Sequence, residues 1–242
     1  MRCRLALVCV GLGAIGTGRL FAADGIKSPV ESVRTERFPF APNGTIRIAD
    51  SVGRLIITGW DEPSVEVTVR KSLGPDYTLS QQADAVQHLE RVRITTDHRS
   101  DTNMVISTVL SPGGMFPPWP HKTAAGVLID YDLHVPRGVQ LTIHGSGYIE
   151  VSDVSGNIEA TSRSGDIVLM LPGAGPYSID ARCRFGKVDS DYAGSARRSH
   201  LLGERFAQSS GSHHIFLRVG FGGITIKQLP SESEPHDPVL DR

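Results

Sequence analysis

The stretch that decides the fold is SGYIEVSDVSGNIEATSRSGDIVL, residues 146–169. Its glycines, Gly147, Gly156 and Gly165, are nine residues apart, each follows a serine, and an apolar residue stands two positions after each. Ser-Gly is a strong turn signal, because glycine adopts the positive φ of a tight corner. The alternation of polar and apolar residues after each glycine is typical of a half-buried strand. A corner and a short strand at a fixed step predict a coiled β-rod in which each rung covers the next.

The same step occurs far upstream, at Gly44 and Gly53. We therefore predict one all-β domain over residues 38–229, a β-solenoid or β-helix-like stack of short strands. Further strand patterns stand at residues 65–70, 92–96, 104–110, 127–135, 139–143, 177–179, 186–188, 215–219 and 223–226.

Two segments interrupt the strand pattern. Over residues 79–91 apolar side chains recur at helical spacing after a capping box, which predicts one short amphipathic helix. Residues 111–125 contain four prolines and several aromatic residues, and they predict a long exposed loop inserted in the domain, because proline removes backbone donors.

The two ends of the chain have their own composition. Residues 1–23 combine early arginines, an apolar stretch and small residues, and they resemble a secretory signal peptide. Residues 24–37 have no periodicity and predict an extended leader, and the polar residues 230–242 predict a disordered tail. We therefore expect an exported protein, periplasmic or secreted to the cell surface.

Removal of the signal peptide changes the charge and the cysteine count. It deletes Arg2, Arg4 and Arg19 and leaves 22 basic against 26 acidic residues, a net charge of −4. A mildly acidic chain argues against a nucleic-acid binder. Cys183 then remains as a lone cysteine, which we interpret as a small buried apolar residue. No second long apolar run follows, so no transmembrane segment is expected in the mature chain.

The pattern Gly53-x-x-Ile56-x-x-Gly59-Trp60-Asp61, followed by alternating valines at 65, 67 and 69, resembles the opening of a bacterial exported putative-adhesin family of unknown function. Leu133-His-Val135-Pro136 and the later glycines match the order of that family's units. The resemblance covers roughly residues 38–229. It implies a β-solenoid with Gly-x-Ile/Val repeats and an exported location, and it brings no catalytic residues.

Metal and nucleophile patterns are weak. Asp130, Asp132 and His134 share one face of a strand, which we interpret as a solvated face, because side chains in one line do not converge on a cation. His213 and His214 are neighbours and face opposite sides. The serines before the glycines, at 146, 155, 164 and 210, lack a nucleophile-elbow context and are interpreted as turn residues. We expect neither a metal site nor a cofactor.

One catalytic alternative stays open. Glu150 and Glu159 occupy equivalent positions nine residues apart, and in-register stacking of successive rungs would place them close together. Such a pair could bind a cation, or serve as acid and base in a carbohydrate-active enzyme built on a β-helix, although we interpret the two residues first as part of a solvated face.

The inserted loop carries the candidate binding residues Met115, Phe116, Trp119 and His121. Exposed aromatic side chains in a proline-stiffened loop bind partners at low ordering cost, although they could equally cap an open end of the rod. The first hypothesis is a non-enzymatic cell-envelope scaffold or interaction module, adhesin-like, whose partner is an envelope protein or a surface polymer. A loop-mediated assembly module, in which Trp119 docks into another chain, is a further alternative.

Overall fold

The computed structural model describes residues 31–73, 89, 92–110, 127–173, 175–198, 203–209 and 211–230 of the 242-residue chain. These residues form a 15-stranded sheet, which confirms the all-β fold class. The expected signal peptide, the loop residues Met115, Phe116, Trp119 and His121, and the C-terminal tail lie outside the described residues. Of the predicted helix over 79–91 only Leu89 is described, and it is buried.

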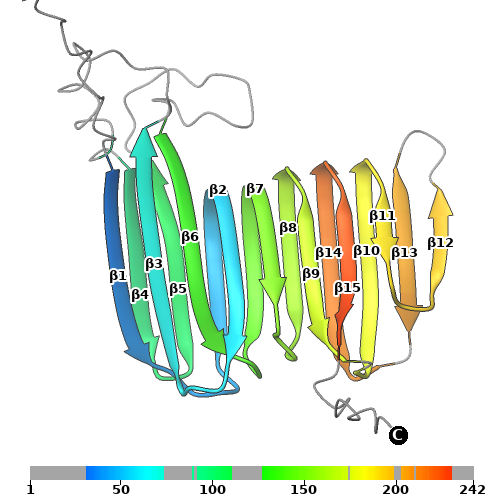
Figure 1. Ribbon diagram of the computed structural model, residues 1–242, viewed down its shortest axis with the longest axis horizontal. Coiled ribbons are helices and arrows are strands. Elements are labelled where there is room, and N and C mark those ends of the chain that lie inside the picture. Colours follow the sequence, from blue (N-terminus) through cyan, green and yellow to red (C-terminus); the bar gives the residue numbers. More distant parts are fainter. Residues whose placement is uncertain are drawn as a thin grey trace, which may run out of the picture.

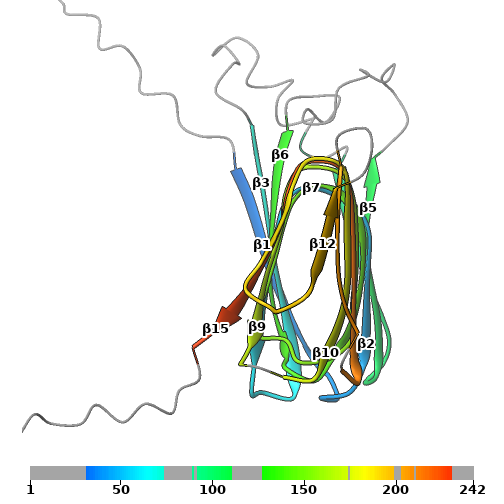
Figure 2. The ribbon, with the colours of Figure 1, turned by 90° about the vertical axis from the view of Figure 1, so that its right-hand side faces the viewer.

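The sheet folds back on itself into two layers that enclose the core (Figures 1 and 2). The layers are joined through β2 (Thr45–Trp60) and β7 (Gln140–Ser152), because the first part of each strand pairs in one layer and the second part pairs in the other. Along β2, Ile46 and Ile48 belong to the first layer and Leu55 and Ile57 to the second, and all four side chains are buried in the core between the layers.

We call the first layer layer I. Its centre is parallel, from β5 to β10, and antiparallel strands flank it at both ends. In spatial order it contains β4 (Val92–Ser100), β5 (Asn103–Leu110), the first parts of β2 and β7, β8 (Ile158–Ser164), β14 (His213–Phe221), β10 (Tyr177–Phe185), β13 (Glu204–Ser209) and β12 (Ser195–Arg198).

Layer II begins with antiparallel strands and continues in parallel. In spatial order it contains β1 (Glu31–Pro39), β3 (Ser64–Leu73), β6 (Val127–Pro136), the second parts of β2 and β7, β9 (Ile167–Pro172), β15 (Ile224–Leu229) and β11 (Val188–Ser190). Residues 31–37, assigned from the sequence to an extended leader, make up most of the edge strand β1.

A column of glycines marks the corner where the chain passes from layer I to layer II. Gly53, Gly147, Gly165, Gly222 and Gly186 follow one another along the column, and all have positive φ, from 96° to 146°. A Cβ on Gly147 would lie 1.9 Å from the backbone oxygen of Gly53. The corner therefore requires glycine twice over, for its backbone conformation and for the close approach of the next chain segment.

The nine-residue step is half of a turn. Gly147 and Gly165 are neighbours in the corner column, whereas Gly156 lies at the opposite edge, where its Cβ would be 2.0 Å from the backbone oxygen of Val139. The sequence interpretation, which made each nine-residue unit a separate rung, is corrected to one turn per 18 residues, from 147 to 165. Each turn contributes one strand to each layer, as β8 and β9 do.

Chain order and spatial order differ near the C-terminus. The last described segment contains β14 and β15. In layer I, β14 fills a slot between β8 and β10, and in layer II, β15 fills the corresponding slot between β9 and β11. All four pairings are parallel. To reach this slot the chain crosses the start of β10, where a Cβ on Gly211 would lie 2.0 Å from the backbone of Pro176 and His213 N donates to Pro176 O at 3.0 Å. The segment is therefore held between strands that precede it in the sequence.

Candidate functional site

The most strongly charged surface that we identify is the outer face of layer I near its C-terminal end. Along β8, β14, β10 and β13, alternate residues are buried in the core, so that the residues between them face outward. With the edge strand β12, these outward positions hold two carboxylates, Glu159 and Asp180, against six arginines, a surplus of four positive charges. The arginines are Arg163, Arg182, Arg184, Arg197, Arg205 and Arg218.

Four of these arginines lie side by side. Arg218 on β14 is in register with Arg182 on β10, which is in register with Arg205 on β13, which is in register with Arg197 on β12. We call Arg218, Arg182, Arg205 and Arg197 the arginine row. Like charges directly opposite each other on neighbouring strands destabilise a sheet. The row therefore needs either an internal counter-charge or an anionic partner.

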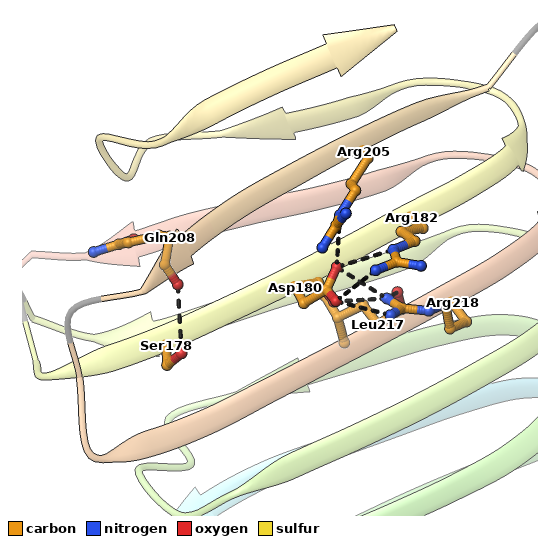
Figure 3. A network of polar contacts seen from close by, with 7 residues as sticks. All are labelled: Ser178, Asp180, Arg182, Arg205, Gln208, Leu217 and Arg218. Atoms are coloured by element: carbon orange, nitrogen blue, oxygen red, sulfur yellow. Dashed lines mark hydrogen bonds and ion pairs between the residues drawn. The ribbon is translucent and has the colours of Figure 1, made fainter. Parts of the chain in front are cut away.

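Asp180 supplies an internal counter-charge for three of the four (Figure 3). Arg182 donates to both of its carboxylate oxygens, at 3.2 and 3.1 Å, and Arg218 Nη2 donates to Oδ2 at 3.0 Å. Arg205 Nε lies 3.4 Å from Oδ1. One carboxylate thus faces three guanidinium groups, and two positive charges remain uncompensated around it.

These contacts set the ionisation of Asp180. Burial raises its pKa, but the hydrogen bonds from Arg218 and Arg182 outweigh burial, so that the pKa lies below the ordinary 3.8. Asp180 is therefore a carboxylate at neutral pH. Its lone pairs are engaged by the arginines, which makes it a poor proton acceptor for catalysis.

Aromatic side chains lie beside the arginines. The guanidinium carbon of Arg218 is 3.6 Å from the ring centroid of Phe216, a cation–π contact that holds the arginine against the sheet. Phe185 and Phe221, at the adjacent corner, stack with ring centroids 4.7 Å apart. Phe221 is 59 % exposed, so this stack borders the charged surface as an apolar edge.

A cavity of about 290 Å³ opens beside the row. Its lining is formed by Arg182, Arg197, Arg198, Glu204, Arg205 and Cys183. Burial raises the pKa of Cys183 to about 11, and its thiol donates to Lys187 O at 3.3 Å. The thiol is therefore protonated and unreactive at neutral pH. Because the lining holds four arginines against the single carboxylate of Glu204, the cavity attracts anions.

The structure separates the two glutamates of the enzymatic alternative. Glu150 is in register with Ile56 and Val168 in layer II, whereas Glu159 is in register with Thr142 and Phe216 in layer I. A nine-residue step is half a turn, so it moves a residue to the other layer. The Glu150–Glu159 ladder, which the sequence left open as an alternative, is therefore wrong, because the two carboxylates stand in different layers.

The other candidates are placed as simple surface and turn residues. Asp130, Asp132 and His134 line the outer side of β6, opposite the buried Ile129, Tyr131 and Leu133. His134 packs against Trp60, with ring centroids 5.3 Å apart. Within the described part of the chain, no group of three His, Cys, Asp or Glu side chains could hold a metal ion.

The histidines of β14 and the corner serines also have structural roles. The ring of His213 lies 6.2 Å from that of Tyr177, while the next residue, His214, is exposed. Ser146 Oγ and Ser164 Oγ are 3.0 Å apart at the corner, and Ser155 Oγ donates to Arg137 O at 3.1 Å. Ser210 is outside the described residues.

The arginine row escaped the sequence interpretation because its members are scattered over residues 182–218. A net charge taken over the whole chain averages it away. One signal was available, since five arginines fall between residues 182 and 205. Strand register, which brings three of them (Arg182, Arg197 and Arg205) into one line with Arg218, could not be obtained from that count.

In the part of the chain that the structure describes, none of the helical segments has the length and apolar character needed to cross a membrane.

The sequence matches no protein-family model, and no curated protein matches it either. A crystal structure of a putative cell adhesion protein from Clostridium sporogenes ATCC 15579 is similar over 84 % of this chain and 100 % of its own, with a TM-score of 0.46 and 14 % identity. Putative adhesins from Parabacteroides merdae ATCC 43184 and Bacteroides fragilis NCTC 9343 are similar over 80 % and 82 % of this chain and 77 % and 97 % of theirs. Their TM-scores are 0.26 and 0.21, and their identities 7 % and 10 %. At these scores, the function of this chain rests on its own residues.

Proposed function

We propose that this chain is an exported, non-enzymatic β-solenoid that serves as an adhesin-like interaction module of the cell envelope and binds an anionic partner through the arginine row. The observation that carries the proposal is the register of Arg218, Arg182, Arg205 and Arg197 on four adjacent strands, with Asp180 as their counter-charge. A scaffold that needed only stability would not place four like charges opposite one another.

Support for a solenoid comes from the parallel pairings and the corner column. Gly147 and Gly165 stand one 18-residue turn apart, and both layers are parallel on either side of them. Support for export comes from the expected signal peptide in residues 1–23.

Support for binding rather than catalysis comes from the chemistry of the site. Guanidinium groups stay protonated at all relevant pH values and present a fork of donors to carboxylate, sulfate or phosphate. The neighbouring groups that could do chemistry are poorly suited to it, because Asp180 is engaged by arginines and the pKa of Cys183 is about 11.

The test is a binding measurement on the chain that begins at Asp24. Immobilised polygalacturonate and dextran sulfate serve as anionic ligands, and dextran serves as the neutral control. We expect binding to both anionic polymers and a loss of at least about tenfold in affinity for the triple variant Arg182→Gln, Arg197→Gln, Arg205→Gln, because each lost charge-assisted pair weakens the complex.

A matched control carries the same change of charge elsewhere. Arg47, Arg54 and Arg93 are exposed and lie away from the row, so their replacement by glutamine should leave binding within about twofold. Equal losses for the two triple variants would mean that only net charge matters. That result, or no binding of the wild type to either polymer, would refute the proposal.

A further inference from the structure

The arginine row continues beyond its four arginines. On β8 the next position in register is Thr161, and on β7 it is His144. One line across six neighbouring strands thus contains four arginines, a threonine and a histidine, and no carboxylate. The two carboxylates of the face, Glu159 and Asp180, stand in the adjacent line, two residues earlier along their strands.

The direction of this line restricts the ligand. It runs across the strands and therefore along the long axis of the molecule (Figure 1). Neighbouring strands are about 4.8 Å apart, so the four arginines span about 14 Å with one positive charge per strand. A small anion would contact one or two of them. Occupying all four requires an extended polymer with regularly spaced negative charges.

Resting on the proposed function, we infer that the arginine row is the binding track for a linear anionic polysaccharide that lies along the stack and carries one carboxylate or sulfate per sugar. An extended pyranose residue is about as long as the spacing between adjacent strands, so successive sugars meet successive arginines. Arginine pairs with carboxylate or sulfate through two parallel hydrogen bonds, which gives direction as well as attraction.

Single-stranded nucleic acid fits the face less well. Proteins that bind it stack successive bases on exposed aromatic side chains. Phe216, in the neighbourhood of the row, is 39 % exposed, but the Arg218 guanidinium already stacks on its ring, with the guanidinium carbon 3.6 Å from the centroid. Phe185 and Phe221 stack on each other at the corner.

The experiment is a length series. Oligogalacturonates of one to eight sugars are titrated into the chain that begins at Asp24, with the fully methyl-esterified oligomers as neutral controls of equal length. We expect affinity to rise by about tenfold or more between the dimer and the tetramer and to level off beyond four sugars, because four arginines are then paired. The esterified oligomers should not bind.

Variants locate the track. Arg205→Gln, in the middle of the row, should make the affinities of the dimer and the tetramer nearly equal, whereas Arg54→Gln in layer II should leave the length dependence unchanged. Oligomers that bind equally at every length would overturn the polymer track and leave an anion site, as proposed above. Tighter binding of single-stranded oligodeoxynucleotides of matched charge would overturn the polysaccharide. No binding of any anion would overturn both proposals.

Discussion

Gly147 lies in the corner column, where its φ is 124° and the space for a side chain is already occupied by the backbone oxygen of Gly53. Gly173 also has a positive φ, 56°, but no atom of the described residues lies within 4 Å of its would-be Cβ. The two residues therefore separate two requirements that glycine usually meets together: a left-handed backbone and close contact with the next turn.

We expect Gly147→Ala to destabilise the protein by roughly 3 kcal/mol or more, because the new methyl group meets a backbone atom that cannot move without disturbing β2. Gly173→Ala should cost only about 1 kcal/mol, the penalty of the conformation alone. Urea unfolding of both variants measures the difference. Similar midpoints would show that the corner column is not tightly stacked.

Replacing Asp180 should lower the stability of the protein and raise its affinity for an anionic ligand. Asp180→Asn leaves three guanidinium groups facing one another without their counter-charge, so we expect a loss of about 1 kcal/mol in stability. The same change releases donors toward a ligand, and affinity for polygalacturonate should increase. A purely structural role for the cluster predicts the loss of stability with no gain in binding, which a paired unfolding and binding measurement detects.

The pH dependence follows from the pKa of Asp180. Because the folded-state pKa is below 3.8, its stabilising contribution is present above that value and is lost as pH falls through the folded-state pKa. The difference in stability between wild type and Asp180→Asn should therefore be constant from pH 5 to 8 and disappear in more acidic solution. A difference that persists well below the folded-state pKa would contradict the ion-pair explanation.

At the scale of elements, strands and corners could be predicted from the sequence, because both are local. The alternation at residues 127–135 and 215–219 corresponds to β6 and β14, and the Ser-Gly pairs mark real corners. Lateral order was not predictable, since a nine-residue step fits a full turn and half a turn equally well. Only backbone contacts, such as Gly165 on Gly147, distinguish the two.

The placement of β14 and β15 was beyond the sequence for the same reason. Nothing in the order of the strands indicates that the last segment returns to a slot between β8 and β10. The candidate site could not be predicted for the same reason, because Arg218 lies beside Arg182 only when β14 pairs with β10. The individual arginines are visible in the sequence, but their row depends on topology.

The placement of β14 and β15 between earlier strands leads to a prediction about folding. A chain that ends at Ser209 leaves β8, β9, β10 and β11 without their shared neighbours, so backbone donors and acceptors on both sides of the slot lose their partners. We expect this chain not to fold cooperatively, as judged by circular dichroism and urea unfolding. The chain that ends at Pro230 retains every described strand and should unfold like the full protein. Cooperative unfolding of the shorter chain would show that the slot closes without its segment.

On the scale of the whole molecule, charge is unevenly distributed. The chain has a formal net charge of −1, yet the outward positions of β8, β14, β10, β13 and β12 in layer I hold six arginines against two carboxylates. Acidic residues such as Asp130, Asp132 and Glu150 lie on layer II. A polyanion is therefore attracted most strongly to the C-terminal part of layer I, so that the field orients the ligand before contact.

This asymmetry makes binding more sensitive to salt than the net charge would suggest. At about 0.15 M salt charges are screened over roughly 8 Å, and at 1 M over about 3 Å, which is less than the spacing of the arginine row. Affinity for polygalacturonate should therefore fall steeply between 0.05 and 0.5 M NaCl, as counter-ions compete for the four guanidinium groups. In the triple variant Arg182→Gln, Arg197→Gln, Arg205→Gln the slope of log affinity against log salt should be less than half as steep, since a single arginine of the row remains. Equal slopes for the two proteins would mean that the polymer is held by the general field of the molecule rather than by the row.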